Sequence, residues 1–343
     1  MVRKRPELLT FADKGIYCPI ADIYIDPWKP VQRALITHGH ADHARWGHRY
    51  YVTSSENKPI LTKRLGAINI HSLPFGEVFN VNGIKFSFHP AGHVVGSAQI
   101  RVENRGDVWV VSGDYKSEND GLSGVFEPLT CRVFITESTF GIPVYKWEPQ
   151  ESIIDDINRW WNENKELGKV SILTGYALGK AQRLVRGLDS SIGPIYTDAY
   201  IDQFNQIIRG LGKSLPQTKI IHEIPKSSDL NGAMIVVSPQ ALRAPWIRRL
   251  KDISVGAASG WMRLRGARRR RGVDRGFVIS DHVDWIALNN TIDMTRAEKV
   301  YVTHGYTHIF ARWLNERGIQ AEIVQTRYDE EWSDGIESSG SQE

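Results

Sequence analysis

Short apolar runs separated by turn residues dominate the chain between Gly15 and Glu137. Several runs alternate apolar with polar residues, as in Ile84-Lys85-Phe86-Ser87-Phe88, and this period of two predicts strands of sheets that have one wetter face. Strands are predicted over residues 21–25, 33–37, 50–53, 84–89, 98–102, 108–112 and 132–136. We therefore expect the first part of the chain to be rich in β-sheet.

The pattern changes after Gly141. Between residues 151 and 167, Ile153, Ile157 and Trp160 recur at the spacing of one helix face, which predicts a helix packed against a core. Buried strands are predicted over 170–174, 233–237 and 253–257, and helices over 180–188, 202–211 and 242–250. Strands that alternate with helices indicate a small α/β domain.

The strand-rich pattern returns near residue 275. Strands are predicted over 276–280, 299–303 and 320–324, with one helix after residue 284 and another over 310–317. The polar residues at the end of the chain are expected to form a disordered tail.

Side chains that can hold a metal ion or move a proton follow the predicted strand 33–37 directly: His38, His40, Asp42 and His43. Gly39 and Ala41 between them are small enough to let the backbone turn tightly. Imidazole and carboxylate ligands together suit zinc, manganese or iron. A solvated polar turn is the simpler interpretation, but three of the eleven histidines of the chain lie in this stretch, which favours a metal site.

Three more candidate ligands stand at predicted strand ends: His93 in a glycine-punctuated loop, Asp114 after the strand 108–112, and His304 after the strand 299–303. His38 and His304 both lie in the sequence Thr-His-Gly, which suggests two similar half-sites facing one centre. With the first four, these residues are too many for one tetrahedral ion and about right for two. Two metal ions that share Asp114 could activate a hydroxide that attacks a phosphate ester.

Composition narrows the class of protein. With 41% hydrophobic and 24% charged residues, the chain is expected to be soluble and globular. No apolar stretch approaches the roughly 18 residues of a membrane span, so no membrane partner is expected. Cys18 and Cys131 are the only cysteines and suggest no disulfide framework, which favours a cytoplasmic location. A net charge of +4 mildly favours a polyanionic substrate.

The densest charge run of the chain contains six arginines: Arg263, Arg265, Arg268, Arg269, Arg270 and Arg271. A solvated loop would explain such a run. However, arginine suits bidentate phosphate contacts, and Trp261 nearby offers a ring on which a base can stack. We favour nucleic-acid binding for this segment.

In their order along the chain, these motifs resemble a known family. The residues His38, His40, Asp42 and His43, followed by His93 and Asp114, are similar to the motifs of the metallo-β-lactamase superfamily. Glu137, His282 and His304 resemble three further motifs of its β-CASP branch, which processes nucleic acids. The resemblance covers nearly the whole chain.

The resemblance implies an α/β fold, namely the αββα sandwich of the metallo-β-lactamases with an inserted α/β cap domain. Residues 1–150 and 275–330 would be the two parts of the metallo-β-lactamase domain, 151–274 the β-CASP cap, and 331–343 the disordered tail. It also implies the ligands of two divalent ions, with zinc favoured and manganese the alternative. His38, His40 and His93 would hold one ion, Asp42, His43 and His304 the other, and Asp114 both.

The catalytic residues implied by the resemblance are Asp42, Glu137 and His282. His282 would contact the scissile phosphate and donate the leaving-group proton, and Glu137 would orient it. Within the branch, the run 260–285 most resembles that of bacterial ligase-associated DNA exonucleases. This implies an exonuclease in DNA repair that hydrolyses phosphodiester bonds and acts with a DNA ligase and a helicase.

One residue favours RNA instead. A histidine at the position of His304 is typical of RNA-cutting members of the branch, so an RNA 3′-end processing ribonuclease of the same architecture is the alternative. Small-molecule hydrolysis is disfavoured by the arginine run and by the pair of Glu137 and His282. A protein that binds nucleic acid without cutting it is disfavoured because all seven ligand positions are retained.

The arginine run leads to a direct test. Replacing residues 268–271 by alanine should weaken binding of a labelled DNA strand and flatten the dependence of its affinity on salt. With fewer phosphate contacts, binding releases fewer counterions from the strand. Fluorescence anisotropy over a salt series measures both effects. Unchanged affinity would instead identify the run as a solvated loop.

Overall fold

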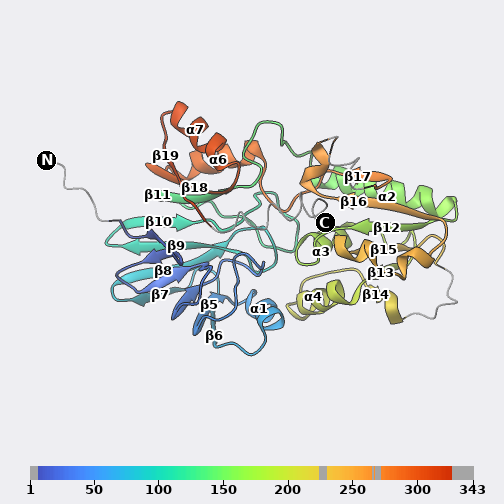
Figure 1. The fold of residues 1–343 in the computed structure, drawn as a ribbon, viewed down its shortest axis with the longest axis horizontal. Helices are drawn as coiled ribbons and strands as arrows, with labels where there is room; N and C mark the ends of the chain where they lie inside the picture. Colours follow the sequence, from blue (N-terminus) through green and yellow to red (C-terminus); the bar gives the residue numbers. More distant parts are fainter. Residues whose placement is uncertain (1–6, 224–229, 265, 267–271, 327–343) are drawn as a thin grey trace, which may run out of the picture. The chain divides into compact units, whose positions relative to one another are not determined.

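A computed structural model describes residues 7–223, 230–264, 266 and 272–326 of the chain (Figure 1). The chain divides into two compact units, one made of Met1–Pro143 with His282–Glu343 and the other of Val144–Asp281. Both units combine strands with helices, so the predicted α/β class is confirmed. The expected tail, 331–343, lies outside the described residues.

The first unit contains two sheets. One has the strand order β1-β2-β3-β4-β5-β6 and consists of β1 (Thr10–Ala12), β2 (Gly15–Cys18), β3 (Ile23–Ile25), β4 (Arg33–Leu35), β5 (Tyr50–Ser54) and β6 (Ile70–Leu73). The other has the order β19-β18-β11-β10-β9-β8-β7 and consists of β7 (Val78–Val81), β8 (Ile84–Pro90), β9 (Ala98–Asn104), β10 (Asp107–Val111), β11 (Val133–Ser138), β18 (Lys299–Gly305) and β19 (Gln320–Ile323).

These sheets and three helices form four layers. Residues of both sheets share one core, which includes Ile25 of β3 and Ile135 of β11. The outer face of the first sheet packs against α1 (Lys58–Leu65). The outer face of the second packs against α6 (Trp285–Thr295) and α7 (Thr307–Glu316).

Strand β11 shows why the prediction of one wetter face does not hold everywhere. All of its residues are buried. Val133 and Ile135 enter the core between the sheets, and Phe134 enters the core beneath α6 and α7. A strand covered on both faces needs no polar alternation, whereas β8, which exposes Lys85, keeps it.

The second sheet collects several chain segments at one edge. Strands β10, β11 and β18 are mutually parallel, and β9 runs antiparallel to both β8 and β10. The carboxyl ends of β8, β10, β11 and β18 therefore meet at the same edge. The amide N–H of Ala98 donates to the carbonyl oxygen of Thr37 at 2.9 Å and links this edge to the chain that follows β4.

The second unit is built on one parallel sheet of strand order β14-β13-β15-β12-β16-β17. Its strands are β12 (Val170–Thr174), β13 (Ile195–Thr197), β14 (Lys219–Ile220), β15 (Met234–Val237), β16 (Ile253–Ala258) and β17 (Arg275–Phe277). Its α-helices in the described residues are α2 (Gln150–Glu166), α3 (Lys180–Gly187) and α4 (Ala199–Gly210).

The helix predicted over 242–250 is wrong. Two short 3₁₀ helices, η2 (Pro239–Arg243) and η3 (Ile247–Arg249), occupy this region. Pro245 between them lacks an N–H and disfavours helical geometry in the preceding residue, so no continuous helix forms. None of the helices in the described part of the chain combines the length and the apolar character that crossing a membrane requires.

Candidate metal centre

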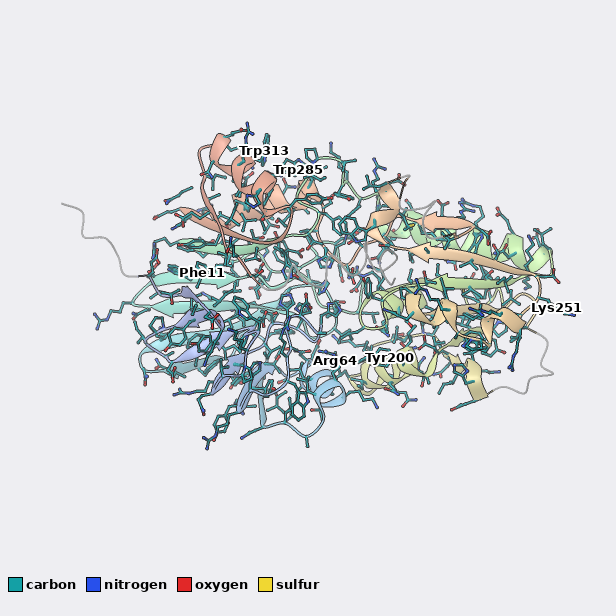
Figure 2. All side chains as sticks on the ribbon, in the orientation of Figure 1. Phe11, Arg64, Tyr200, Lys251, Trp285 and Trp313 are labelled. Carbon is teal, nitrogen blue, oxygen red and sulfur yellow. The ribbon has the colours of Figure 1, made fainter. Side chains whose placement is uncertain are left out.

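The segment that carries the first candidate ligands, residues 38–49, is called the metal loop below. It follows β4 after two buried residues, Ile36 and Thr37. Its first turn is closed by the N–H of Ala44, which donates to the carbonyl oxygen of His40 at 2.8 Å. Arg64 lies on the last turn of α1 (Figure 2). Its guanidinium donates to the carbonyl oxygen of Gly39 and, at 3.4 Å, to that of Ala44. The loop is therefore held from inside and from the neighbouring helix.

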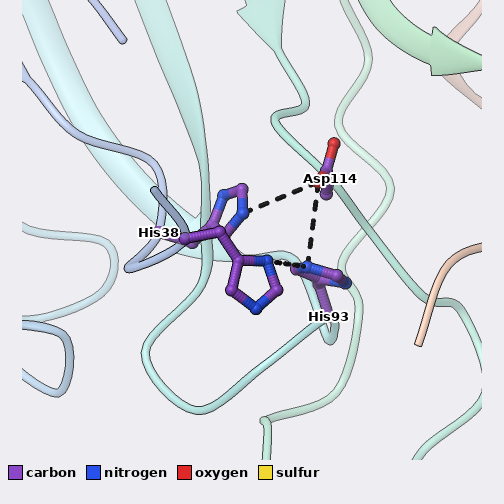
Figure 3. Close-up of side chains that lie close together, drawn as sticks. His38, His93 and Asp114 are labelled. Carbon is purple, nitrogen blue, oxygen red and sulfur yellow. Dashed lines mark hydrogen bonds and ion pairs between the residues drawn. The ribbon is translucent and has the colours of Figure 1, made fainter. Parts of the chain in front are cut away.

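A first group of possible ligands consists of His38, His40, His93 and Asp114, whose ligand atoms all lie within 4.8 Å of one another. Figure 3 shows His38 and His93 converging on Asp114. The Nε2 atoms of His38 and His93 lie 3.6 and 3.8 Å from Oδ2 of Asp114. The Nδ1 atom of His40 lies 3.1 Å from Nε2 of His93.

A second group shares Asp114 with the first. His43, Asp114 and His304 have ligand atoms within 4.8 Å of one another. Asp42 faces the same place, because its Oδ2 lies 3.6 Å from Nε2 of His43 and 3.4 Å from Nε2 of His304. Nδ1 of His304 lies 3.7 Å from Oδ1 of Asp114. All seven side chains expected from the sequence thus lie together, with Asp114 between the two groups.

The residues fit divalent metal ions. Nε2 of His38 and Oδ1 of Asp114 are buried and have no hydrogen-bond partner among the described residues. Around them, nitrogen atoms of His38, His93 and His304 lie 3.6 to 3.8 Å from oxygens of Asp114, too far for hydrogen bonds. Two ligands of one tetrahedral zinc ion are about 3.4 Å apart, given bonds of about 2.0–2.1 Å. The donor set of imidazoles and carboxylates is also that of zinc or manganese sites.

The electrostatics of the cluster call for a cation. Burial lowers the pKa of His43, but the carboxylates of Asp42, Asp114 and Asp26 outweigh burial and raise that pKa to about 10. Burial and the neighbouring imidazoles hold the pKa of His38 well below its usual range, so its imidazole is neutral. Without metal, a proton on His43 balances the buried carboxylates, and a metal ion can take over that role.

Asp26 supports the centre and was missed in the sequence. Its Oδ2 accepts a hydrogen bond from Nδ1 of His43 at 2.7 Å, which leaves Nε2 of His43 directed at Asp42 and Asp114. Its carboxylate also accepts from the N–H of Thr37 at 2.8 Å and from the hydroxyl of Thr37 at 2.6 Å. A lone Asp before Pro27 resembles an ordinary turn residue, so nothing local distinguished it.

Strained backbone occurs at the centre. Asp26 and His304 adopt left-handed conformations, with φ of 43° and 55°. Such conformations cost non-glycine residues about 1–3 kcal/mol and persist only where the surroundings impose them. Gly305 also has positive φ, at 73°, and a Cβ there would lie 2.5 Å from the carbonyl oxygen of Ser138. The contact between β18 and β11 therefore requires a glycine directly after His304.

Glu137 and His282 form a hydrogen-bonded pair beside the cluster. Nδ1 of His282 lies 2.9 and 3.1 Å from the two carboxylate oxygens of Glu137. The N–H of Tyr115, at 2.8 Å, and the hydroxyl of Thr139 also donate to Glu137. Burial raises the pKa of Glu137, but the charge and hydrogen bond of His282 and the other donors outweigh it and lower that pKa. The ring of His282 lies 4.6 Å from that of His93, between centroids.

The arginine run is only partly described. Arg263 is exposed on η4 (Gly260–Arg263), and its Nε donates to the carbonyl oxygen of Val144 at 3.4 Å. Arg265 and residues 268–271 lie outside the described residues. Their proposed contact with nucleic acid stays a prediction from the sequence.

Comparison with known proteins finds relatives named for a ligase and for an endoribonuclease. The chain is 28% identical over 329 residues to a probable DNA ligase of Opitutus terrae, covering 95% of this chain and 32% of that protein. It is 34% identical over 122 residues to endoribonuclease YSH1 of Saccharomyces cerevisiae, covering 35% of this chain and 15% of that protein. For endoribonuclease ysh1 of Schizosaccharomyces pombe the identity is 26% over 296 residues, covering 71% of this chain and 38% of that protein.

The matched region thus spans 32% of the length of the ligase-named relative. It spans 15% and 38% of the lengths of the two endoribonucleases. No protein-family model matches it. A crystal structure of a protein of unknown function from Enterococcus faecalis resembles it with a TM-score of 0.56 at 13% identity, covering 86% of this chain and 79% of that one. This likeness concerns the fold alone. The named relatives suggest the superfamily that the motifs resemble.

Metal binding can be measured directly. His40→Ala and Asp114→Asn should each reduce the metal that co-purifies with the protein, and Asp114→Asn should have the larger effect because it alters both ligand groups. Inductively coupled plasma mass spectrometry on protein loaded with zinc or manganese gives the content. His71→Ala, an exposed histidine of β6, is the matched control and should leave it unchanged. Full metal content in both ligand variants would remove the proposed centre.

Glu137 should also make stability depend on pH. Because its pKa is lowered in the folded chain, its ionised form stabilises the fold above the ordinary value of 4.5, and this contribution is lost as pH falls through the folded value. Glu137→Gln should lower the free energy of unfolding by about 1–3 kcal/mol at pH 7 and by less in acid. Urea unfolding from pH 7 downward measures this. Glu127→Gln, which alters an exposed carboxylate near His89, should change little.

Proposed function

We propose that this chain is a divalent-metal-dependent nuclease of the β-CASP branch of the metallo-β-lactamase superfamily. The observation that carries the proposal is Asp114, whose Oδ2 lies 3.6 to 3.8 Å from nitrogens of His38, His43 and His93 and whose Oδ1 lies 3.7 Å from Nδ1 of His304, so that both groups of histidines surround one carboxylate. A carboxylate shared in this way suits two ions held close together, the arrangement used for in-line displacement at phosphorus. Structural metal sites are closed around one ion and do not require a shared carboxylate.

The proposed ligands divide as the two groups do. His38, His40 and His93 would hold one ion, Asp42, His43 and His304 the other, and Asp114 both. When bound, the ions supply Lewis acidity that neutralises charge on the phosphoryl oxygens and lowers the pKa of water. Asp26 serves this set by fixing the ring of His43.

His282 is proposed to handle the proton of the leaving oxygen. Its Nδ1–H donates to the ionised Glu137, which fixes the tautomer and orientation of the ring. The remaining nitrogen, Nε2, can then carry a proton to the oxygen that leaves phosphorus. The N–H of Tyr115 and the hydroxyl of Thr139 donate to Glu137 and keep its carboxylate in place.

The domain arrangement is proposed on the same resemblance. Residues 1–150 and 275–330 would form the metallo-β-lactamase domain, and residues 151–274 the β-CASP cap. The four layers of the first unit and the parallel sheet of the second support a division into two such domains, but the units change after Pro143 and after Asp281, because β17 pairs with β16 of the second unit.

DNA is the substrate we favour, cleaved as by an exonuclease in repair. The similarity over 95% of this chain to a protein named as a DNA ligase supports DNA and a ligase as functional partner. RNA is the second candidate, because the similarity to proteins named endoribonuclease and the presence of His304 both favour it.

A strand assay tests the activity and its substrate. Single strands of DNA and RNA of one sequence, labelled at either end, are incubated with the zinc- or manganese-loaded chain and resolved on denaturing gels. We expect the DNA strand to be shortened progressively from one end, and His282→Ala to cut at least about 100-fold more slowly with its metal content intact. Preferential cleavage of the RNA strand would favour the second candidate. No cleavage of either strand would overturn the proposal.

A further inference from the structure

Trp46 on the metal loop is the most exposed of the large hydrophobic residues among the described parts of the chain, with 70% of its surface accessible. Its indole N–H nevertheless has a fixed partner, the carbonyl oxygen of Leu65 at the end of α1, at 2.8 Å. A tryptophan ring left in water gives up the stabilisation that burial of a large apolar side chain provides. The ring of Trp46 is thus held in place without being buried.

The attachment connects Trp46 with the candidate ligands. Trp46 lies three residues after His43, so their Cα atoms are at most about 11 Å apart. Trp46 joins the loop to α1 through Leu65, and the next residue back along α1, Arg64, joins α1 to the loop through Gly39 and Ala44. Together these bonds attach the end of the helix to the loop that carries His38 to His43.

The surroundings of Trp46 are basic. Residues 44–66 contain five basic side chains and one acidic one, a net charge of +4 that equals that of the whole chain. Arg49 and Lys63 are exposed, and Arg45 is half-buried. None of these three forms an ion pair with a carboxylate of the described residues. Nε of Arg45 donates to the carbonyl oxygen of Asp42 at 3.4 Å, and the guanidinium of Arg49 lies 5.4 Å from the centroid of the Tyr50 ring. Their charges are available to an anion.

We propose that Trp46 is a stacking platform for one base of a single strand bound at the metal centre, with Arg45, Arg49 and Lys63 contacting its phosphates. An exposed ring among unpaired cations matches single-stranded nucleic acid, whose bases all offer a face for stacking and whose backbone offers regular negative charge. A purely apolar protein partner would have to remove water from the same cations without compensating their charge, which is unfavourable. The inference rests on the proposed nuclease function and names part of its substrate site.

The test measures binding of fluorescein-labelled dT20 by anisotropy. The zinc-loaded His282→Ala chain serves as the background, so that the strand is held without being cut. Adding Trp46→Ala should weaken binding of dT20 about tenfold, because this is the loss expected when one base can no longer stack on an aromatic ring. Trp46→Phe, which keeps an aromatic face, should recover most of the loss. The dependence on salt should not change in either variant.

A set of dT20 strands that each lack one base separates stacking from a general loss of folding. In the background chain, one missing base should weaken binding far more than the others. With Trp46→Ala the same strand should bind no worse than intact dT20, because the partner of that base is gone. Lys63→Ala should behave oppositely, keeping the sensitivity to the missing base while lowering the salt slope by about 0.7.

Trp313→Ala is the matched control. Trp313 is also exposed, at 38%, and its indole N–H also has a fixed acceptor, Oδ1 of Asn289 at 2.8 Å, but it lies on α7 beside Trp285 (Figure 2). It should bind dT20 as the background does. Equal affinity of the Trp46→Ala and background chains, with unchanged sensitivity to missing bases, overturns the inference while leaving the nuclease proposal intact. Failure of the unmodified chain to bind or cut any strand overturns both.

Discussion

Buried carboxylates that need a positive charge are the constraint on which the rest of this centre depends. Asp26, Asp114 and Glu137 are each almost fully buried, and an ionised carboxylate inside a protein costs several kcal/mol unless it is compensated. Glu137 is compensated by three donors, namely His282, the N–H of Tyr115 and the hydroxyl of Thr139. Asp26 is compensated by His43 and Thr37. Asp114 has no such set, and its Oδ1 lacks any hydrogen-bond partner among the described residues. The cluster is therefore suited to hold a metal ion.

The sheet supplies what the electrostatics require. Parallel strands end at the same edge of a sheet. Asp114, Glu137 and His304 lie at or just after the carboxyl ends of β10, β11 and β18, so they are close together. The cores on both faces of this sheet then fix the strand ends. Gly305 packs tightly against Ser138 of the adjacent strand, and this packing sustains the left-handed backbone at His304.

Side chains that are not candidate ligands hold the candidate residues in place, and they differ between the metal loop and the sheet edge. On the metal-loop side, Asp26 and Arg64 hold the ring of His43 and the backbone around it. On the sheet side, Glu137 holds His282, a residue that is partly exposed and so can meet a substrate. One side thus fixes the candidate ligands by hydrogen bonds, and the other presents a partly exposed imidazole.

Local sequence determined the elements and the candidate ligands, because both depend on short-range chemistry. Alternation of apolar residues located β8, and helical spacing of Ile153, Ile157 and Trp160 located α2, each within two residues of the observed bounds. Clustered histidines identified the metal loop. Helix α1 was missed because only three of its eight residues are apolar aliphatic, and β13 because three residues carry too little periodicity. Pro245 was overlooked as the residue that divides a predicted helix.

Only the tertiary structure decided which of these residues share a centre and what holds them. Asp26 lies 17 positions from His43 in the sequence and Glu137 lies 145 from His282, so their hydrogen bonds leave no local pattern. The same holds for Trp46, because its exposure and its bond to Leu65 depend on how α1 packs beside the loop. A sequence states which side chains can bind a metal ion or a base, whereas distance, burial and the loss of solvent, which set their chemistry, arise when distant segments pack together.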